Sequence, residues 1–220
     1  MLNSERRARS LDTLMDATLS TLADVGFTRL RTADVSKRSG MSEGTLFRYF
    51  PTKYDLVRAA LERTLQGHVE RLVARFVELE AGAVDRLSLL TMLWELLSHP
   101  EMAWTFELFA AAYTDHELRT TIAPVLQEHS QQVDIAASSV MVEFGGITPE
   151  DAVMAINLAT WSMQGLVLRD MARGDTNAAS ELVEYLLHLS NLAYPLSPSR
   201  AAPRITAATV PGTKSRPTAR

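Results

Sequence analysis

The chain has 220 residues, of which 46% are apolar and 22% charged, an ordinary balance for a folded protein with a sizeable core. It has no cysteine, which excludes disulfides and thiolate metal sites, and no apolar run long enough to span a membrane. Residues 1–15 lack the apolar segment of a secretion signal. We therefore expect a cytoplasmic protein with no membrane partner.

The net charge of −4 is unevenly distributed along the chain. Residues 1–53 hold nine Lys/Arg against six Asp/Glu, whereas residues 54–194 hold eight against twenty. Residues 195–220 hold five basic residues and no acidic one. A basic N-terminal segment followed by an acidic body predicts that any polyanion is bound by the N-terminal segment.

Apolar residues recur at helical spacing from residue 5 to about 194, and no alternating strand pattern of useful length occurs. The spacing predicts an all-α fold of about nine helices. A long helix should run from Lys53 to about Glu80. The candidate N-caps are Thr32, Ser42, Thr52 and Thr148, and the candidate terminating glycines are Gly26, Gly40 and Gly174.

The remaining helices are expected at 84–98, 101–113, 115–143, 148–173 and 177–194. Pro124 should break or restart the helix that contains it. Residues 195–220 contain five prolines and few residues to bury, so they are predicted to be a disordered tail.

Two short helices separated by the stretch SGMS form a helix-turn-helix candidate from Thr32 to Phe50. If Leu46 and Phe50 face inward, the helical step turns Thr45, Arg48 and Tyr49 outward. Arginine can pair with a guanine edge or a phosphate, and tyrosine can stack on a sugar or donate its hydroxyl. Spacing alone leaves a plain packing motif equally open.

The stretch Leu14–Glu62 closely resembles the N-terminal domain of tetracycline-repressor (TetR) family regulators. The resemblance rests on an apolar first helix followed by GF, DV, GMS, GTL and RYF, then a cap and a lysine. It implies a homodimer that binds double-stranded operator DNA. By this resemblance the DNA-contacting residues are Thr32, Ser42, Gly44, Thr45, Phe47, Arg48, Tyr49 and Lys53, with Arg6, Arg7 and Arg9 adding phosphate contacts.

Two positions depart from the family pattern. The family usually has a basic or small residue where this chain has Glu43, and a carboxylate there would repel a phosphate. Glu43 can instead cap its own helix or accept from a cytosine amino group. The family often has tyrosine where this chain has Phe47, so a hydroxyl contact is lost.

The domain organisation expected from these features is residues 1–52 for DNA binding, 53–194 for ligand binding and dimerisation, and 195–220 for the tail. The last two helices carry apolar stripes and small residues, which pack either on their own monomer or on a second copy. The resemblance implies a dimer interface there, with Ala155, Ala159, Ser162, Leu182, Leu186 and Leu189 as the candidate residues.

Aromatic and methionine side chains concentrate in residues 92–113 and return near Trp161. They suit either a core or an apolar ligand pocket, and the resemblance implies a pocket for a small, largely apolar or aromatic effector. The candidate pocket residues are Trp94, Met102, Trp104, Phe106, Phe109, Tyr113, Trp161 and Gln164. The candidate polar anchors are Glu107, Gln164 and Asn157.

We expect no enzyme activity, cofactor or metal. In the run Asp115-His116-Glu117, adjacent helical residues point in different directions and cannot chelate one ion. The leading hypothesis is a ligand-responsive repressor in which the helix starting at Lys53 transmits the effector signal. The alternatives are an activator, a ligand-binding module without operator affinity, and a metal-dependent enzyme using His99, His116 or His129.

Overall fold

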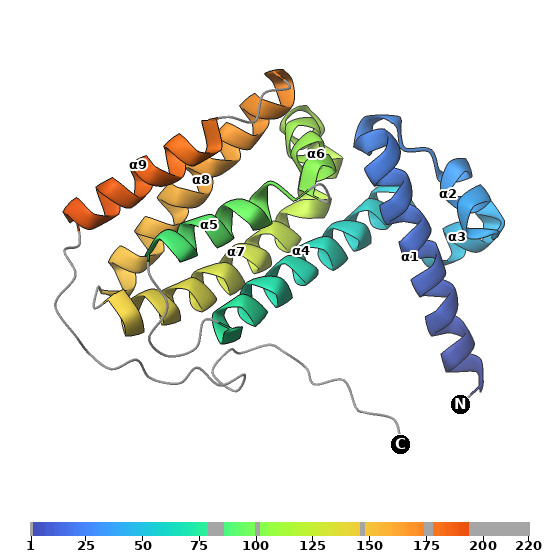
Figure 1. Cartoon of the computed structure of the whole chain (residues 1–220). Helices are drawn as coiled ribbons and strands as arrows, with labels where there is room; N and C mark the ends of the chain where they lie inside the picture. The colour runs from blue at the N-terminus through green and yellow to red at the C-terminus, as the bar shows by residue number, and fades with distance from the viewer. Residues whose placement is uncertain (1, 79–85, 100–101, 146–147, 174–177, 194–220) are drawn as a thin grey trace. The chain divides into compact units, whose positions relative to one another are not determined.

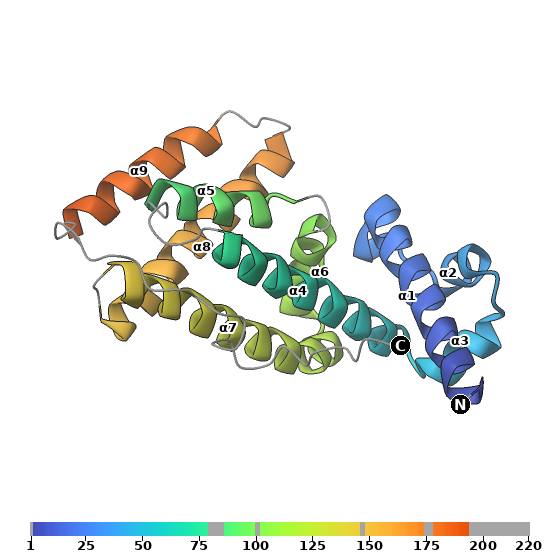
Figure 2. The same cartoon turned by 60° about the horizontal axis from the view of Figure 1, so that its bottom comes forward.

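A computed structural model describes residues 2–78, 86–99, 102–145, 148–173 and 178–193 (Figure 1 and Figure 2). Within these ranges the chain forms nine α-helices and no strand. This result confirms the all-α fold that the apolar spacing predicted. No helix in the described ranges is both long enough and apolar enough to cross a bilayer.

The helices follow one another along the chain with short connections. They are α1 (Leu2–Arg29), α2 (Thr32–Ser39), α3 (Glu43–Tyr49), α4 (Lys53–Glu78), α5 (Arg86–Leu97), α6 (Ala103–Thr114), α7 (His116–Gly145), α8 (Pro149–Arg173) and α9 (Ala178–Ala193). These bounds agree with the predicted helices to within a few residues.

The described residues pack into two compact units. Unit 1 is drawn from Met1–His68 and Ser98–His129, and unit 2 is drawn from Val69–Leu97 and Ser130–Arg220. This division follows packing, whereas the predicted boundary after residue 52 separates functions. The domain boundaries therefore stay a prediction, and the expected tail at 195–220 lies outside the described residues.

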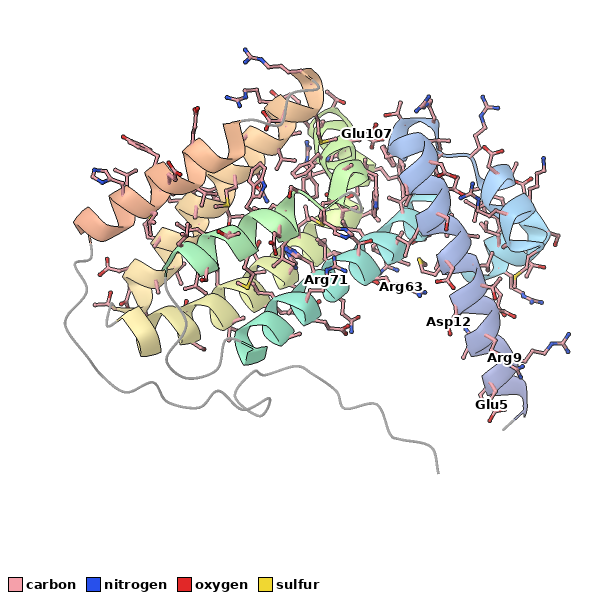
Figure 3. All side chains as sticks on the ribbon, viewed as in Figure 1. Glu5, Arg9, Asp12, Arg63, Arg71 and Glu107 are labelled. Atoms are coloured by element: carbon pink, nitrogen blue, oxygen red, sulfur yellow. The ribbon has the colours of Figure 1, made fainter. Side chains whose placement is uncertain are left out.

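In unit 1, α1 packs against both α2 and α6, and α2 packs against α3. The fully buried side chains of unit 1 include Leu14, Leu22, Val35, Leu46, Leu56, Val57, Leu61 and Leu108. Arg63 of α4 also donates to Asp16 of α1 over 2.7 Å. Figure 3 labels Arg63 on α4, beside α1. That pair is exposed and contributes about 0–1 kcal/mol, so apolar burial provides most of the stability of unit 1.

Gly26 produces a kink near the end of α1 rather than the end that the sequence predicted. Its φ of 73° and ψ of 176° lie in a region that is essentially restricted to glycine, and helical geometry resumes through Arg29. The carboxylate of Glu107 from α6 (labelled in Figure 3) lies against this kink and accepts from the Thr28 N–H over 3.3 Å. A Cβ at Gly26 would lie 2.5 Å from that carboxylate.

The helix starts show which predicted caps are correct. The Thr52 hydroxyl accepts from Asp55 N over 3.0 Å, and Asp55 accepts in return, which confirms the cap of α4. Thr148 accepts from Asp151 N over 3.2 Å and so caps α8. The prediction for Thr32 was wrong, because Arg31 is at the N-cap and Thr32 is the first helical residue.

Pro124 does not break α7, contrary to the prediction. The helix runs continuously from His116 to Gly145 with Pro124 inside it. A proline removes one intrahelical hydrogen bond and strains one turn, and the rest of this helix retains its pattern. Gly174, the other predicted stop in this region, lies outside the described residues.

In unit 2, α5 packs against both α8 and α9, which lie side by side (Figure 1 and Figure 2). The larger core cluster joins Leu93 and Leu97 of α5 to Ala159 and Met163 of α8 and to Leu186 of α9. A second cluster contains Leu72, Met92, Leu96 and Ala136. Each helix of unit 2 therefore turns one apolar face inward.

Gly26→Ala should destabilise the protein by about 3 kcal/mol, because alanine is strained in this backbone conformation and its Cβ displaces the Glu107 carboxylate from the kink. Gly40→Ala is the matched control. Gly40 has a φ of 70°, but a Cβ there would meet no atom within 4 Å, so we expect a loss of about 1 kcal/mol. Urea unfolding of the three proteins gives both values. Equal losses at the two positions would show that the kink at Gly26 requires glycine no more than the left-handed C-cap at Gly40 does.

Candidate nucleic-acid interface and effector-binding residues

The turn between α2 and α3 is set by two local features. Gly40 takes a left-handed conformation at the C-cap of α2, which confirms the predicted stop. Ser42 then caps α3 and accepts from Thr45 N over 3.2 Å. These two residues fix the direction in which α3 leaves the turn.

The short helix α3 has one buried side and one exposed side. Leu46 is 0% exposed and Phe50 is 8% exposed, so they form the predicted inward ridge. Phe47 is 41% exposed, and Arg48 is also exposed. An exposed arginine and an exposed phenylalanine next to each other on so short a helix suit a partner that is both flat and anionic.

Two arginine side chains approach the ring of Tyr49. The guanidinium carbon of Arg48 lies 5.6 Å from the ring centroid, and that of Arg7, from the N-terminal turns of α1, lies 6.0 Å from it. Arg48 lies next to Tyr49 in the helix-turn-helix motif, whereas Arg7 lies 42 residues before Tyr49 in the sequence. The fold thus brings two positive charges to one aromatic ring.

Thr32 and Glu43 contact each other. The Thr32 hydroxyl donates to Glu43 Oε1 over 2.9 Å, which links the first residue of α2 to the first residue of α3. Glu43 therefore does not cap its own helix, which was one of the two roles that the sequence predicted for it. The cap is supplied by Ser42.

Gly44, Thr45 and Lys53 complete the predicted contact set. A Cβ at Gly44 would meet only Ser42 Oγ, at 3.9 Å, so packing within the described chain does not require glycine there. The Thr45 hydroxyl lies 3.0 Å from Ser42 Oγ. The Lys53 ammonium lies 4.9 Å from the Phe27 ring centroid, and burial lowers the pKa of Lys53. Contact of these residues with DNA stays a prediction.

The candidate pocket residues divide between the two units. Met102, Trp104 and Phe106 are buried in unit 1. Tyr113 of the same unit is 83% exposed, and Trp161 of unit 2 is 63% exposed. The others are half-buried: Phe109 in unit 1, and Trp94 and Gln164 in unit 2. The pocket stays a prediction.

Two of the three candidate polar anchors have partners within their own unit. Glu107 binds the kink of α1, as described above. Asn157 donates to Asp134. Burial raises the pKa of Asp134, and this hydrogen bond offsets part of that increase. These contacts give both side chains a structural role.

Two imidazoles stack in unit 1, one buried and one half-buried, and one of them belongs to His68, which no sequence motif had indicated. His68 of α4 and His129 of α7 stack with ring centroids 5.3 Å apart and an angle of 29° between the rings. Burial lowers the pKa of His129 to about 4. The His129 ring is therefore neutral near pH 7 and stacks on His68 without adding a positive charge. The one sequence signal for this pair is that His68 stands on the apolar side of α4, between Leu65 and Leu72.

Histidine and acidic residues do not gather into a metal site within the described ranges, where no group of three or more such side chains has suitable geometry. Asp115 instead accepts from Leu118 N over 2.9 Å at the start of α7, and it also binds the Tyr54 hydroxyl. These hydrogen bonds lower the pKa of Asp115. The run Asp115-His116-Glu117 thus contributes a helix start.

The predicted dimer residues fall on two different faces. Ala159 and Leu186 are buried in the core of unit 2, and Leu182 packs against that core. Leu189 is 38% exposed, while Ala155 and Ser162 are half-buried. The large exposed apolar side chains on these helices are Met154, Leu158, Trp161, Leu168, Met171, Tyr185 and Leu189, of which Leu189 alone was predicted as a dimer residue.

Residues 14–60 match the family described as "Bacterial regulatory proteins, tetR family". An uncharacterised HTH-type transcriptional regulator of Mycobacterium bovis is 32% identical over 133 residues, which are 60% of this chain and 68% of the relative. The HTH-type transcriptional regulator CymR of Pseudomonas putida is 27% identical over 78% of this chain and 84% of its own. The HTH-type transcriptional repressor KstR of Mycolicibacterium smegmatis is 34% identical over 30% of this chain and 32% of its own.

Solved structures share the fold at lower identity. A transcriptional regulator from Rhodococcus sp. Rha1 has a TM-score of 0.68 at 20% identity, and the alignment covers 85% of this chain and 98% of the other. The regulator FadR from Bacillus subtilis, solved in complex with stearoyl-CoA, has a TM-score of 0.60 at 17% identity, with 82% and 97% covered.

His129 should make the stability of the protein fall as the pH drops. Its pKa is about 4 in the folded chain and about 6.5 when unfolded, so the unfolded state takes up a proton first. The contribution is complete above about pH 7 and is lost as the pH falls from 6.5 towards 4, about 2 kcal/mol at pH 5. His129→Phe, which keeps a ring on His68, should lose less stability between pH 7.5 and pH 5 in urea unfolding.

The control for this measurement is His188→Gln, which removes an exposed histidine and should leave the pH dependence as in the wild type. If His129→Phe loses as much stability on acidification as the wild type, burial of His129 does not control the effect.

Proposed function

The chain belongs to the tetR family of bacterial regulatory proteins, and on that premise we propose that this helix-turn-helix transcriptional regulator is a repressor. It binds a palindromic operator as a homodimer and releases it when a small, largely apolar effector binds. The name of the Mycolicibacterium smegmatis relative, a repressor, supports the direction of control.

The observation that carries DNA binding is the cluster of Arg7, Arg48 and Tyr49. Two guanidinium groups share one aromatic ring, and neither arginine forms an ion pair with a carboxylate of the described chain. Other arginines of unit 1 do, since Arg38 pairs with Asp24 and Arg63 with Asp16. A phosphate backbone supplies the negative charge that this cluster lacks.

Dimerisation is supported by the exposed apolar side of α8. Met154, Leu158, Trp161 and Leu168 are 48% to 64% exposed and are separated by four, three and seven residues, which places them on one side of the helix. Gly165, on the same side, has no neighbouring atom within 4 Å of a Cβ position. Tyr185 and Leu189 add exposed apolar surface on α9. We propose that a second copy of this chain covers this surface.

The dimer gives the operator its symmetry. Two α3 helices separated by about 34–36 Å fit successive major grooves on one side of a duplex. A dimer with a two-fold axis therefore binds two half-sites of opposite orientation.

Effector response is supported by the apolar residues in and directly before α6 and by the contact of that helix with α1. The buried side chains Met102, Trp104 and Phe106 suit an apolar ligand, and the structural relative from Bacillus subtilis was solved with stearoyl-CoA. Glu107 of α6 binds the kink of α1, so a ligand that moves α6 would also act on α1. The coupling needed is about 1–3 kcal/mol.

Arg48→Ala should reduce affinity for the operator at least about thirtyfold in the dimer, because each half-site loses a contact worth about 1–3 kcal/mol. Fluorescence anisotropy with the DNA flanking its own gene measures the loss. Arg63→Ala removes the same charge from an exposed residue that pairs with Asp16, and it should keep most of the affinity. An Arg48→Ala protein with wild-type affinity would contradict the proposed interface.

A reporter fused to the same flanking DNA tests the direction of control. Deleting the gene should raise reporter output, because a repressor is removed. A fall in output would identify an activator.

Leu158→Glu should convert the dimer to a monomer, because it places a carboxylate in an apolar interface. Sedimentation velocity measures the change. Gln127→Glu adds the same charge at an exposed polar position and should leave the dimer intact. If Leu158→Glu stays dimeric, the second copy binds elsewhere.

A further inference from the structure

One acidic side chain lies on the exposed surface of α3 among the residues proposed to contact DNA. Glu43 is exposed, and its Oε1 accepts from the Thr32 hydroxyl over 2.9 Å. It forms no ion pair with any basic side chain in the described ranges. A carboxylate here would weaken phosphate binding, so its presence calls for a different contact.

The helical step of α3 divides its exposed surface into three strips. Glu43 and Phe47 are four residues apart and share one edge, and Thr45 and Tyr49 share the opposite edge. Gly44 and Arg48 lie between them, on the side opposite the buried Leu46. The basic and aromatic cluster thus occupies the central strip and one edge, and an acceptor beside an apolar ring occupies the other edge.

The hydrogen bond from Thr32 holds Glu43 in place. An exposed glutamate samples several rotamers, and a contact to the first residue of α2 restricts this freedom. Oε1 is the atom that accepts from the threonine hydroxyl. Oε2 remains as an acceptor with a defined position, and a defined acceptor can discriminate between bases.

The chemistry of Glu43 and Phe47 matches one kind of base edge. In the major groove, cytosine offers an N4 amino donor and thymine offers a C5 methyl group. A carboxylate accepts from the first, and a phenylalanine ring packs on the second. Guanine presents two acceptors to the major groove, which a carboxylate repels.

We propose that Glu43, positioned by Thr32, is a specificity-determining residue that selects a cytosine in each operator half-site, while Phe47 contacts the C5 side of a neighbouring pyrimidine. This assignment rests on the proposed function, because it requires α3 to enter the major groove. It gives the one acidic group on this surface a role in sequence selection rather than in affinity.

The test is selection from a pool of randomised duplexes with the full chain, followed by anisotropy on the enriched duplexes and on single-base variants of them. The wild type should enrich a palindrome with one C·G pair per half-site whose replacement weakens binding about tenfold. Glu43→Ala should lose the preference at that pair alone. Glu43→Gln should shift the preference towards adenine, which an amide recognises through its donor and acceptor together.

Two further variants separate positioning from charge. Thr32→Val keeps the shape and removes the hydroxyl, so it should weaken discrimination at the same base pair and leave the other positions unchanged. Asp34→Asn removes an exposed acidic charge in the first turn of α2 and should leave the consensus unchanged. Circular dichroism of each variant checks that the fold is retained.

The outcomes distinguish this inference from the function on which it rests. If the wild type enriches no sequence, DNA binding and this inference both fail. If it enriches a palindrome that Arg48→Ala no longer binds, but the Glu43 variants change no position, only this inference fails. If Glu43→Ala raises affinity for all duplexes equally, Glu43 acts by repelling phosphate, and this inference is also overturned.

Discussion

The burial of Leu46 and Phe50 is the constraint on which the rest of the interface depends. A helix of seven residues is not stable by itself in water, so α3 exists because these two side chains fill the core of unit 1. Once they point inward, the positions of Glu43, Phe47, Arg48 and Tyr49 are fixed by the helical step. The burial of two side chains thus determines which residues of α3 are exposed, and the caps at Gly40 and Ser42 determine where α3 begins.

The helices of unit 2 also have a buried side and an exposed side, but here the exposed side of α8 is apolar. The inward side of α8 contributes Ala159 and Met163 to the core, and the outward side exposes Leu158 and Trp161. A helix that is apolar on both sides buries one side within its own chain, and an exposed apolar side of this size is typical of a surface that binds a partner. The small residues that the sequence suggested for a dimer include some that serve the core, and the larger exposed residues suit the proposed interface.

Local patterns predicted most of the helices because caps and breaks depend on neighbouring residues. Ser42, Thr52 and Thr148 each bind a backbone N–H three residues ahead, a geometry that spacing alone specifies. The prediction for Thr32 was wrong because α2 begins one residue earlier than expected, with Arg31 at the N-cap, and the Thr32 hydroxyl instead donates to Glu43, eleven residues away. Pro124 was misjudged because a long helix tolerates the loss of one hydrogen bond. The Arg7 contribution to the cluster was suggested only by resemblance, since nothing local links Arg7 to Tyr49.

The all-α fold and the helix-turn-helix candidate could be predicted from the sequence, because they follow from apolar periodicity and short-range caps. The family was recognised separately, from the resemblance of the stretch Leu14–Glu62 to the N-terminal domain of its members. Three features could not be predicted from the sequence: which side of each apolar helix is buried, the contact of the Glu107 carboxylate with the kink at Gly26, and the stacking of His68 on His129. These contacts join residues 61 to 81 positions apart, and helical periodicity carries no information about which helix a given face will meet. The contacts between helices are set by close packing of the whole core, in which the apolar sides of several helices must fit together at the same time.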